Sequence, residues 1–208
     1  MRIAAALILV AALAGGASAA RGATPAFSAK VEPVRWADLR FTYRVGCPVG
    51  PAQLRTVEVS YWDFAGKPKV GRIVVARRVA GDVVDVFRQL WAKRFPIRRL
   101  QPISVYHGDD DASMAADNTS GFNCRFVGGT NRWSMHAYGE AIDVNTVENP
   151  YVRGSTVSPP AGRAFLDRSR YRKGMAVRDG VLVRAFASVG WKWGASFGDY
   201  QHFSTTGR

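Results

Sequence analysis

The period of the apolar residues changes from two to about 3.6 in the first half of the chain, and this change limits the folds open to it. The stretch "TVEVSYWDFAG" (56–66) alternates apolar and polar residues, as a half-buried strand does, and "GRIVVARRVA" (71–80) has the features of a second strand. A Gly-Lys-Pro turn between them predicts a hairpin. The following "GDVVDVFRQLWAKRF" (81–95) spaces its apolar residues as a helix does, with Asp82 as the expected N-cap.

The rest of the sequence mixes strands and helices without a regular alternation. Two stretches, 97–106 and 139–145, predict strands, and "DGVLVRAFASVG" (179–190) predicts a helix that ends at Gly190. This irregular order predicts an α+β fold. The chain has six Trp, seven Tyr and eleven Phe, enough core material for one small domain without a disulfide scaffold.

Residues 1–20 have the pattern of a secretory signal peptide. Arg2 precedes an apolar run, and small residues follow that end in Ala17-Ser18-Ala19. An uncleaved anchor is the alternative, but the run is shorter than the ~20 residues that span a membrane. We therefore expect a secreted or periplasmic protein of a bacterial cell envelope, without stable membrane insertion after cleavage.

The formal net charge of +13 indicates an anionic partner. In an exported protein the available polyanions are the cell wall and the membrane surface, so we expect the anionic cell envelope as a partner. The basic residues are scattered and are not interleaved regularly with aromatic residues. The sequence therefore predicts no nucleic-acid partner.

The chain has two cysteines, Cys47 and Cys124. In an oxidising compartment such a pair can close a long loop and stabilise the domain by about 2–4 kcal/mol. The alternative is two separate buried thiols, and the sequence alone leaves both open.

The chain also has only three histidines, and two of them lie beside carboxylates. In "SMHAYGEAIDVN" (134–145), His136 precedes Asp143, and Gly139 between them can make the turn that brings the two together. In "DYQHF" (199–203), Asp199 precedes His202. A catalytic zinc ion needs three ligands of this kind, and a nearby carboxylate can act as general base. We therefore favour a metal site over two unrelated structural histidines.

These two motifs resemble those of the zinc D-alanyl-D-alanine carboxypeptidases (VanY-like), which cut peptides of bacterial peptidoglycan. The pattern SxHxxGxAxD, followed near the C-terminus by DxxHF, carries the resemblance. Further similarity lies in "DNTSGFNCR" (117–125), "NPYV" (149–152) and "GWKWG" (190–194), so the resemblance spans roughly residues 72–204.

The resemblance implies a small α+β domain of the Hedgehog/DD-peptidase type, with a central antiparallel sheet that carries the zinc site and helices packed around it. It implies one zinc ion, peptidoglycan peptides as substrates and a monomer. Residues 71–208 would form the catalytic domain, after an N-terminal extension with the first strands at 21–70. The site residues that it implies are, for the metal, His136, Asp143 and His202 and, for catalysis, Asp199 and Arg125.

Three points stay open at the level of sequence. Relatives carry a substrate-binding arginine after a Ser-Gly-aromatic stretch, and here either Asn123 or Arg125 could serve. The scissile bond could be D-Ala-D-Ala, cut by a carboxypeptidase, or L-Ala-D-Glu, cut by an endopeptidase. A non-catalytic wall-binding module with the same fold is the third alternative. We expect the loops 107–122 and 149–163 to line the cleft that decides among substrates.

Overall fold

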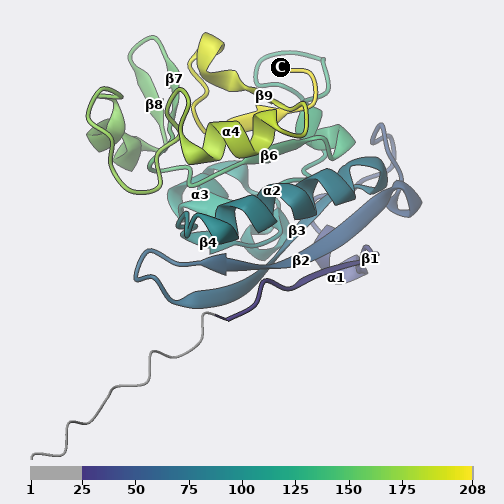
Figure 1. Ribbon diagram of the computed structural model, residues 1–208. Helices are drawn as coiled ribbons and strands as arrows, with labels where there is room; N and C mark the ends of the chain where they lie inside the picture. Colours follow the sequence, from purple (N-terminus) through teal and green to yellow (C-terminus); the bar gives the residue numbers. More distant parts are fainter. Residues whose placement is uncertain (1–24, 208) are drawn as a thin grey trace, which may run out of the picture.

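A long antiparallel hairpin forms the base of the fold in the computed structural model, which describes residues 25–207 (Figure 1). Its strands are β2 (Leu54–Trp62) and β3 (Pro68–Ala76), which pair from Leu54↔Ala76 to Trp62↔Pro68. Strand β1 (Ala29–Pro33) pairs with the other edge of β2 and completes a three-stranded sheet. The predicted hairpin is confirmed. The predicted signal peptide lies outside the described residues.

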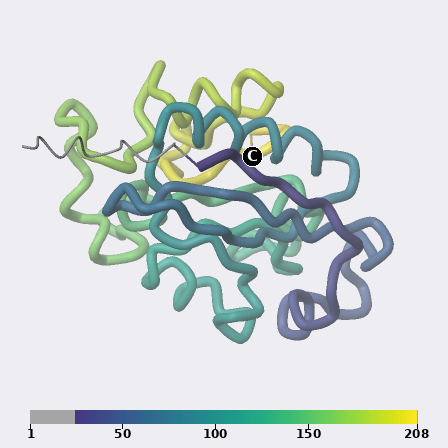
Figure 2. Tube along the Cα trace, turned by 60° about the horizontal axis from the view of Figure 1, so that its bottom comes forward, coloured from purple at the N-terminus to yellow at the C-terminus, as the bar shows by residue number. Residues whose placement is uncertain are grey.

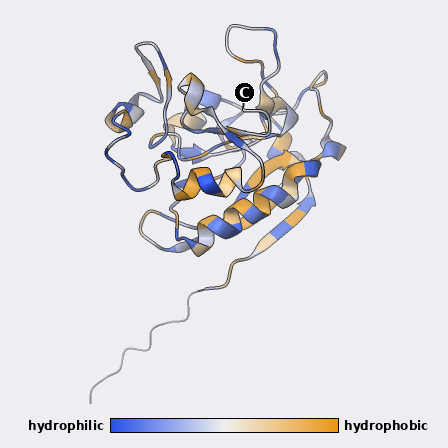
Figure 3. Cartoon of the chain, turned by 45° about the horizontal axis from the view of Figure 1, so that its top comes forward, coloured by the Kyte–Doolittle hydropathy of each residue, from blue (hydrophilic) through white to orange (hydrophobic). Residues whose placement is uncertain are grey.

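Helix α2 (Ala80–Ala92) packs across this sheet (Figure 1). Its buried face includes Val83, Phe87 and Leu90, and Figure 3 shows apolar and polar residues alternating along the helix, as its period requires. Asp82 is not the N-cap that the sequence predicted. The short 3₁₀ turn 77–79 leads directly from β3 into the helix, which therefore begins at Ala80 and places Asp82 in its first turn.

The C-terminal half adds a second antiparallel sheet above α2 (Figure 1). Its strand order is β6 (Ala141–Asp143), β10 (His202–Ser204), β9 (Lys192–Trp193), and α4 (Val181–Ala187) lies beside β9 and α2. Phe186 of α4 stacks on Phe203 of β10 at 4.2 Å between ring centroids. These rings join the core that α2 forms with the hairpin, so distant parts of the chain share one apolar interior.

Several shorter helices and strands lie along the connecting segments. They are α1 (Trp36–Leu39), β4 (Arg99–Leu100), α3 (Asp110–Ala115), β5 (Asn118–Thr119), β7 (Tyr151–Arg153) and β8 (Thr156–Ser158). The mixed α and β character is as predicted, but the strands divide among several small sheets in place of one central sheet. The strand expected at 97–106 is reduced to β4, because Pro102 has no N–H to continue a ladder and a 3₁₀ turn follows it. Among residues 25–207, no helix is long and apolar enough to cross a membrane.

A disulfide joins Cys47 to Cys124, with 5.8 Å between their α carbons, so the bridge considered from the sequence is confirmed. The bridge closes a loop over a sequence separation of 77. Figure 2 shows the segment 34–50, which contains α1 and the loop after it, at one end of the molecule. The bridge therefore ties this loop to the chain that leads into Arg125.

Removing the bridge with Cys47→Ser and Cys124→Ser is expected to lower the free energy of unfolding by about 2–5 kcal/mol, because the unfolded chain regains the entropy of the open loop. Denaturant titration of both proteins measures the loss. Reductant should destabilise the wild type to a similar degree and leave the double variant unchanged. Equal stabilities in oxidising buffer would contradict the prediction.

Arg98 holds two buried carboxylates together. Its guanidinium donates to Asp117 and to Glu148, at 3.1 Å in each case. Glu148 is 2% exposed, and its burial, followed by the neighbouring Asp117 carboxylate, raises its pKa from 4.5 to about 8. The folded state therefore keeps a proton that the unfolded state releases between these pH values. This group makes the free energy of unfolding fall as the pH rises from 4.5 toward 8.

Arg98→Gln is expected to destabilise the protein by about 1–3 kcal/mol above pH 8, because both carboxylates then stay buried without their cation. The loss should be smaller at about pH 5, where a protonated carboxyl can donate to its neighbour. Urea titrations at both pH values measure the difference. Arg88→Gln is the matched control, because Arg88 and its partner Asp85 are both mostly exposed, and it should change stability little. A loss independent of pH would contradict this account of the cluster.

Candidate metal centre

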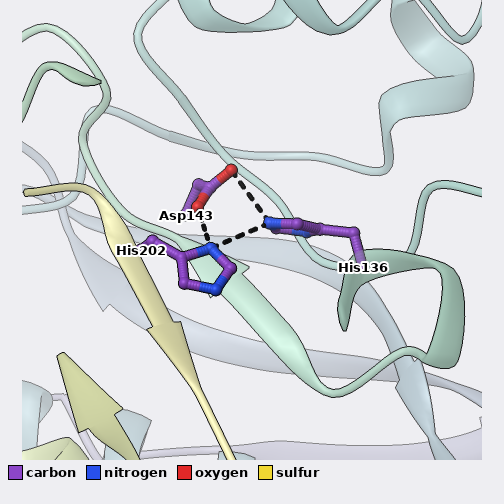
Figure 4. Close-up of side chains that lie close together, drawn as sticks. All are labelled: His136, Asp143 and His202. Carbon is purple, nitrogen blue, oxygen red and sulfur yellow. Dashed lines mark hydrogen bonds and ion pairs between the residues drawn. The ribbon is translucent and has the colours of Figure 1, made fainter. Parts of the chain in front are cut away.

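Three side chains from separate segments converge at one end of the β6–β10 pair (Figure 4). Asp143 ends β6 and His202 begins β10, and the two residues pair directly across the antiparallel ladder, so their side chains lie on the same face. His136 lies on the 3₁₀ turn Met135–Tyr138. His136 Nε2 is 3.1 Å from Asp143 Oδ2 and 3.2 Å from His202 Nδ1, which is 3.1 Å from Asp143 Oδ1.

Gly139 places His136 beside the strand, as the sequence predicted. Its φ of +70° favours glycine, and a Cβ there would lie 2.6 Å from the backbone nitrogen of Ala76. The Gly139 carbonyl accepts the Ala76 N–H at 2.8 Å, which fixes the turn against β3. At the other end of the turn, Ser134 Oγ accepts the backbone N–H of His136 at 3.3 Å.

A backbone carbonyl sets the tautomer of His136. Its Nδ1 lies 2.7 Å from the Gly121 oxygen, and a carbonyl oxygen only accepts, so Nδ1 carries the hydrogen. Neutral His136 therefore turns the Nε2 lone pair toward Asp143 and His202. Metal-ligating histidines are oriented by such a hydrogen bond on their other nitrogen.

The three groups are almost fully buried, at 1% exposed for His136, 4% for Asp143 and 5% for His202. Although burial alone favours the neutral carboxyl, His136 and His202 hold the pKa of Asp143 well below its usual range. Burial opposes charge on His136 as well, yet the Asp143 carboxylate raises its pKa above the usual value. The Asp143 carboxylate and the His136 imidazole thus each favour the charged form of the other.

The spacing of the donor atoms fits a zinc ion. Tetrahedral ligands at about 2.0–2.1 Å from zinc lie about 3.3 Å from one another. The two imidazole nitrogens are 3.2 Å apart, and each lies 3.1 Å from one of the two Asp143 oxygens. Two imidazole nitrogens and one carboxylate oxygen are also ligands that zinc accepts. Three protein ligands would leave a fourth position for water or substrate, as in catalytic zinc sites.

The cluster lines a cavity of about 570 Å³ through His136 and His202. The two loops that the sequence predicted as cleft walls contribute to it: Asp110, Asp111 and Met114 come from the first, and Tyr151, Arg153 and Ser158 from the second. His107, in contrast, does not line this cavity, and its ring packs against Phe41.

Asp199 faces the same cavity as the two histidines. Gly198 before it has φ +79°, and a Cβ there would lie 2.4 Å from the Val152 oxygen, so the chain needs glycine to approach β7. The Asp199 Oδ1 atom is buried and has no hydrogen-bond partner among the described residues. Burial, followed by the Asp143 carboxylate, raises the pKa of Asp199 to about 7. Such a carboxylate can accept and return a proton near neutral pH.

The structure separates the two candidates for the substrate-binding residue. Arg125 lines the cavity, and its Nη2 lies 2.9 Å from Asp110 Oδ2. Asn123 is 5% exposed, does not line the cavity and donates to Asp110 Oδ1 at 3.4 Å. Of the two candidates, Arg125 is the one that lines the cavity.

Sequence reasoning missed two contributors to the site. The Gly121 carbonyl orients His136, but a backbone atom leaves no mark on the residue pattern. Gln201 lines the cavity with its Oε1 buried and unpartnered among the described residues, and its place beside His202 was a usable signal. Asn145, which ends the 134–145 motif, takes no part in the site, and its side chain binds the backbone at Pro96, Arg98 and Gly174.

Residues 128–205 match the sequence model described as D-alanyl-D-alanine carboxypeptidase. The matched segment contains all three converging ligands and Asp199. No curated protein and no solved structure matches the chain. The match agrees with the resemblance drawn from the motifs: over residues 128–205 the chain is similar to the D-alanyl-D-alanine carboxypeptidase family of peptidases.

Proposed function

We propose that this protein is a zinc-dependent peptidase that hydrolyses the stem peptide of peptidoglycan, as a D-Ala-D-Ala carboxypeptidase. One observation carries the proposal: two imidazoles and a carboxylate converge at zinc-ligand spacing in the cavity that Asp199 also lines. The family match over the same residues supports the peptidase class and peptidoglycan as its target.

In this proposal His136, Asp143 and His202 hold one zinc ion, which would act as a Lewis acid toward water and the peptide carbonyl. Asp199 accepts a proton from the attacking water. It then passes that proton to the nitrogen of the departing amine, so that the peptide bond breaks without forming a free amide anion. Arg125 donates to the carbonyl oxygen as negative charge develops there, and Asp110 holds the guanidinium in place.

The proposed setting is the bacterial cell envelope, outside the cytoplasm. The family's peptidoglycan substrate and the Cys47–Cys124 bridge support it, because disulfides persist in oxidising compartments. The formal charge of +13 favours adhesion to an anionic envelope. We propose that the protein acts there as a monomer.

The structure offers a reason to prefer an enzyme over a wall-binding module. A module has no use for the unpartnered, buried Asp199 oxygen in the metal cavity. An L-Ala-D-Glu endopeptidase would use the same groups and is the second candidate.

Mass spectrometry of the products from defined muropeptides tests the proposal. Zinc-loaded protein is incubated with a disaccharide pentapeptide that ends in D-Ala-D-Ala. Loss of one terminal D-alanine supports the carboxypeptidase, whereas cleavage between L-Ala and D-Glu supports the endopeptidase. Tight zinc binding without any cleavage would contradict both peptidase activities and favour the non-catalytic wall-binding module.

A further inference from the structure

Two hollows of about 660 and 470 Å³ are neighbours on the surface, because Arg78, Tyr138 and Glu140 line both. Three separate parts of the chain bring positively charged side chains to their walls: the turn after β3, the segment 126–133 and strand β9. The four cations are Arg77, Arg78, Arg132 and Lys192. Together the two hollows form one cationic region, which we call the basic surface.

Three of these cations have no carboxylate partner. Arg77, Arg132 and Lys192 are exposed, and none of them forms an ion pair within residues 25–207. The Arg132 carbonyl accepts the Val127 N–H at 2.8 Å, and the strand that carries Lys192 pairs with β10. The charges therefore lie on hydrogen-bonded segments and are available to a ligand.

Glu140 is the one carboxylate among the described residues that line the two hollows, and it is 4% exposed. Its Oε1 accepts from Arg78 Nε at 2.8 Å, and its Oε2 accepts from Thr205 Oγ1 at 2.9 Å. Both oxygens are thus occupied by the protein itself. The pair of Arg78 and Glu140 adds no net charge, so the other three cations leave the basic surface positive.

These charges favour an anion that carries several charged groups. A single exposed cation binds a single anion weakly, because water and salt screen the attraction. Contacts from several cations to one chain add up, and a polyanion also releases counterions as it binds. A cationic ligand would be repelled, and a neutral one would gain nothing from the charges.

A polymer fits the basic surface better than a lipid bilayer does. Proteins that lie on bilayers combine cations with exposed apolar side chains that enter the headgroup region. The large apolar side chains that are exposed among residues 25–207 lie elsewhere, and none of them lines either hollow. Each of the two neighbouring hollows can instead accommodate part of one flexible chain.

We propose that the basic surface binds a linear polyanion of the cell envelope, with phosphate or carboxylate groups repeated along its chain. Guanidinium groups bind either of these anions through paired hydrogen bonds. The inference rests on the proposed setting at the envelope, but not on the peptidase reaction. Such binding retains the protein at the wall that contains its proposed substrate.

The test measures the binding of poly(glycerol phosphate) and of poly(glutamate) to the wild type and to the double variant Arg77→Gln with Lys192→Gln, by isothermal titration calorimetry. Neither residue lines the metal cavity. At about 50 mM salt, the double variant should bind about tenfold more weakly than the wild type. The slope of log Kd against the logarithm of the salt concentration should also fall by about two, because two cations are removed.

The matched control removes one lysine and one arginine charge elsewhere, with Lys69→Gln and Arg170→Gln. Both side chains are exposed, and neither lines the two hollows. This control should bind the polymers as the wild type does. Both double variants should hydrolyse a defined muropeptide at the wild-type rate, because neither changes a group that lines the metal cavity.

The outcomes separate this inference from the proposed function. No binding of either polymer, or an equal loss of affinity in the two double variants, would overturn the site. Tighter binding to vesicles of phosphatidylglycerol and phosphatidylcholine than to either polymer would assign the cations to lipid and also overturn it. Binding of only one polymer through these cations supports the site and identifies the anionic group. If the wild type binds a polymer there but cleaves no muropeptide, the site stands and the proposed peptidase fails.

Discussion

Replacing Asp199 with alanine is expected to lower kcat by about 10²–10⁴-fold while the protein still binds one zinc ion. The reason is that Asp199 lines the metal cavity but is not one of the three converging ligands. Its loss removes the group that takes the proton from water and returns it to the amine. The metal ligands and their orientation by Gly121 are unchanged.

Two measurements check this prediction on the same preparations. Metal analysis gives the zinc content, and product release from a disaccharide pentapeptide gives the rate. Asp199→Asn is the conservative partner variant and should be nearly as inactive, because an amide keeps the shape but cannot accept the proton. Asp167→Ala, at an exposed loop carboxylate, is the control and should retain full activity. Turnover by Asp199→Ala close to that of the wild type would show that another group is the base.

Replacing His136 with alanine is expected to remove both zinc binding and hydrolysis. Only Asp143 and His202 would remain as ligands, which is one fewer than catalytic zinc sites use. The change also leaves the Asp143 carboxylate buried with one imidazole in place of two, which adds a cost to folding. Among single changes at the site, we expect this one to affect both metal binding and activity most.

Thermal unfolding with and without added zinc provides a readout that is independent of catalysis. Zinc that binds the folded protein raises the midpoint of unfolding, so the wild type should show a clear increase and His136→Ala little or none. His107→Ala is the matched control, because that imidazole lies outside the metal cavity against Phe41, and its zinc response should equal that of the wild type. An undiminished zinc response of His136→Ala would contradict the ligand assignment.

The elements that the sequence predicted well are those that local periodicity defines. The hairpin of β2 and β3 and helix α2 each carry a long, regular apolar pattern, so the pattern alone locates them. The errors occur where contacts with neighbouring segments determine where an element begins or ends, or which strands pair. Asp82 is a good capping residue, but the turn after β3 starts the helix before it. The strand expected after Pro96 is shortened at Pro102, and the strands divide among several sheets because their pairing depends on tertiary contacts.

By itself, the sequence determined which residues were candidates for the metal site, because only three histidines exist and two of them accompany a carboxylate at a turn or strand end. It could not determine the distances, since His136 and His202 are 66 positions apart. Only the tertiary structure shows that β6 and β10 pair so that Asp143 meets His202, that the Gly121 carbonyl fixes the His136 tautomer, and that Arg125 rather than Asn123 faces the cavity. These facts depend on pairing and packing between distant segments, which local residue patterns do not encode.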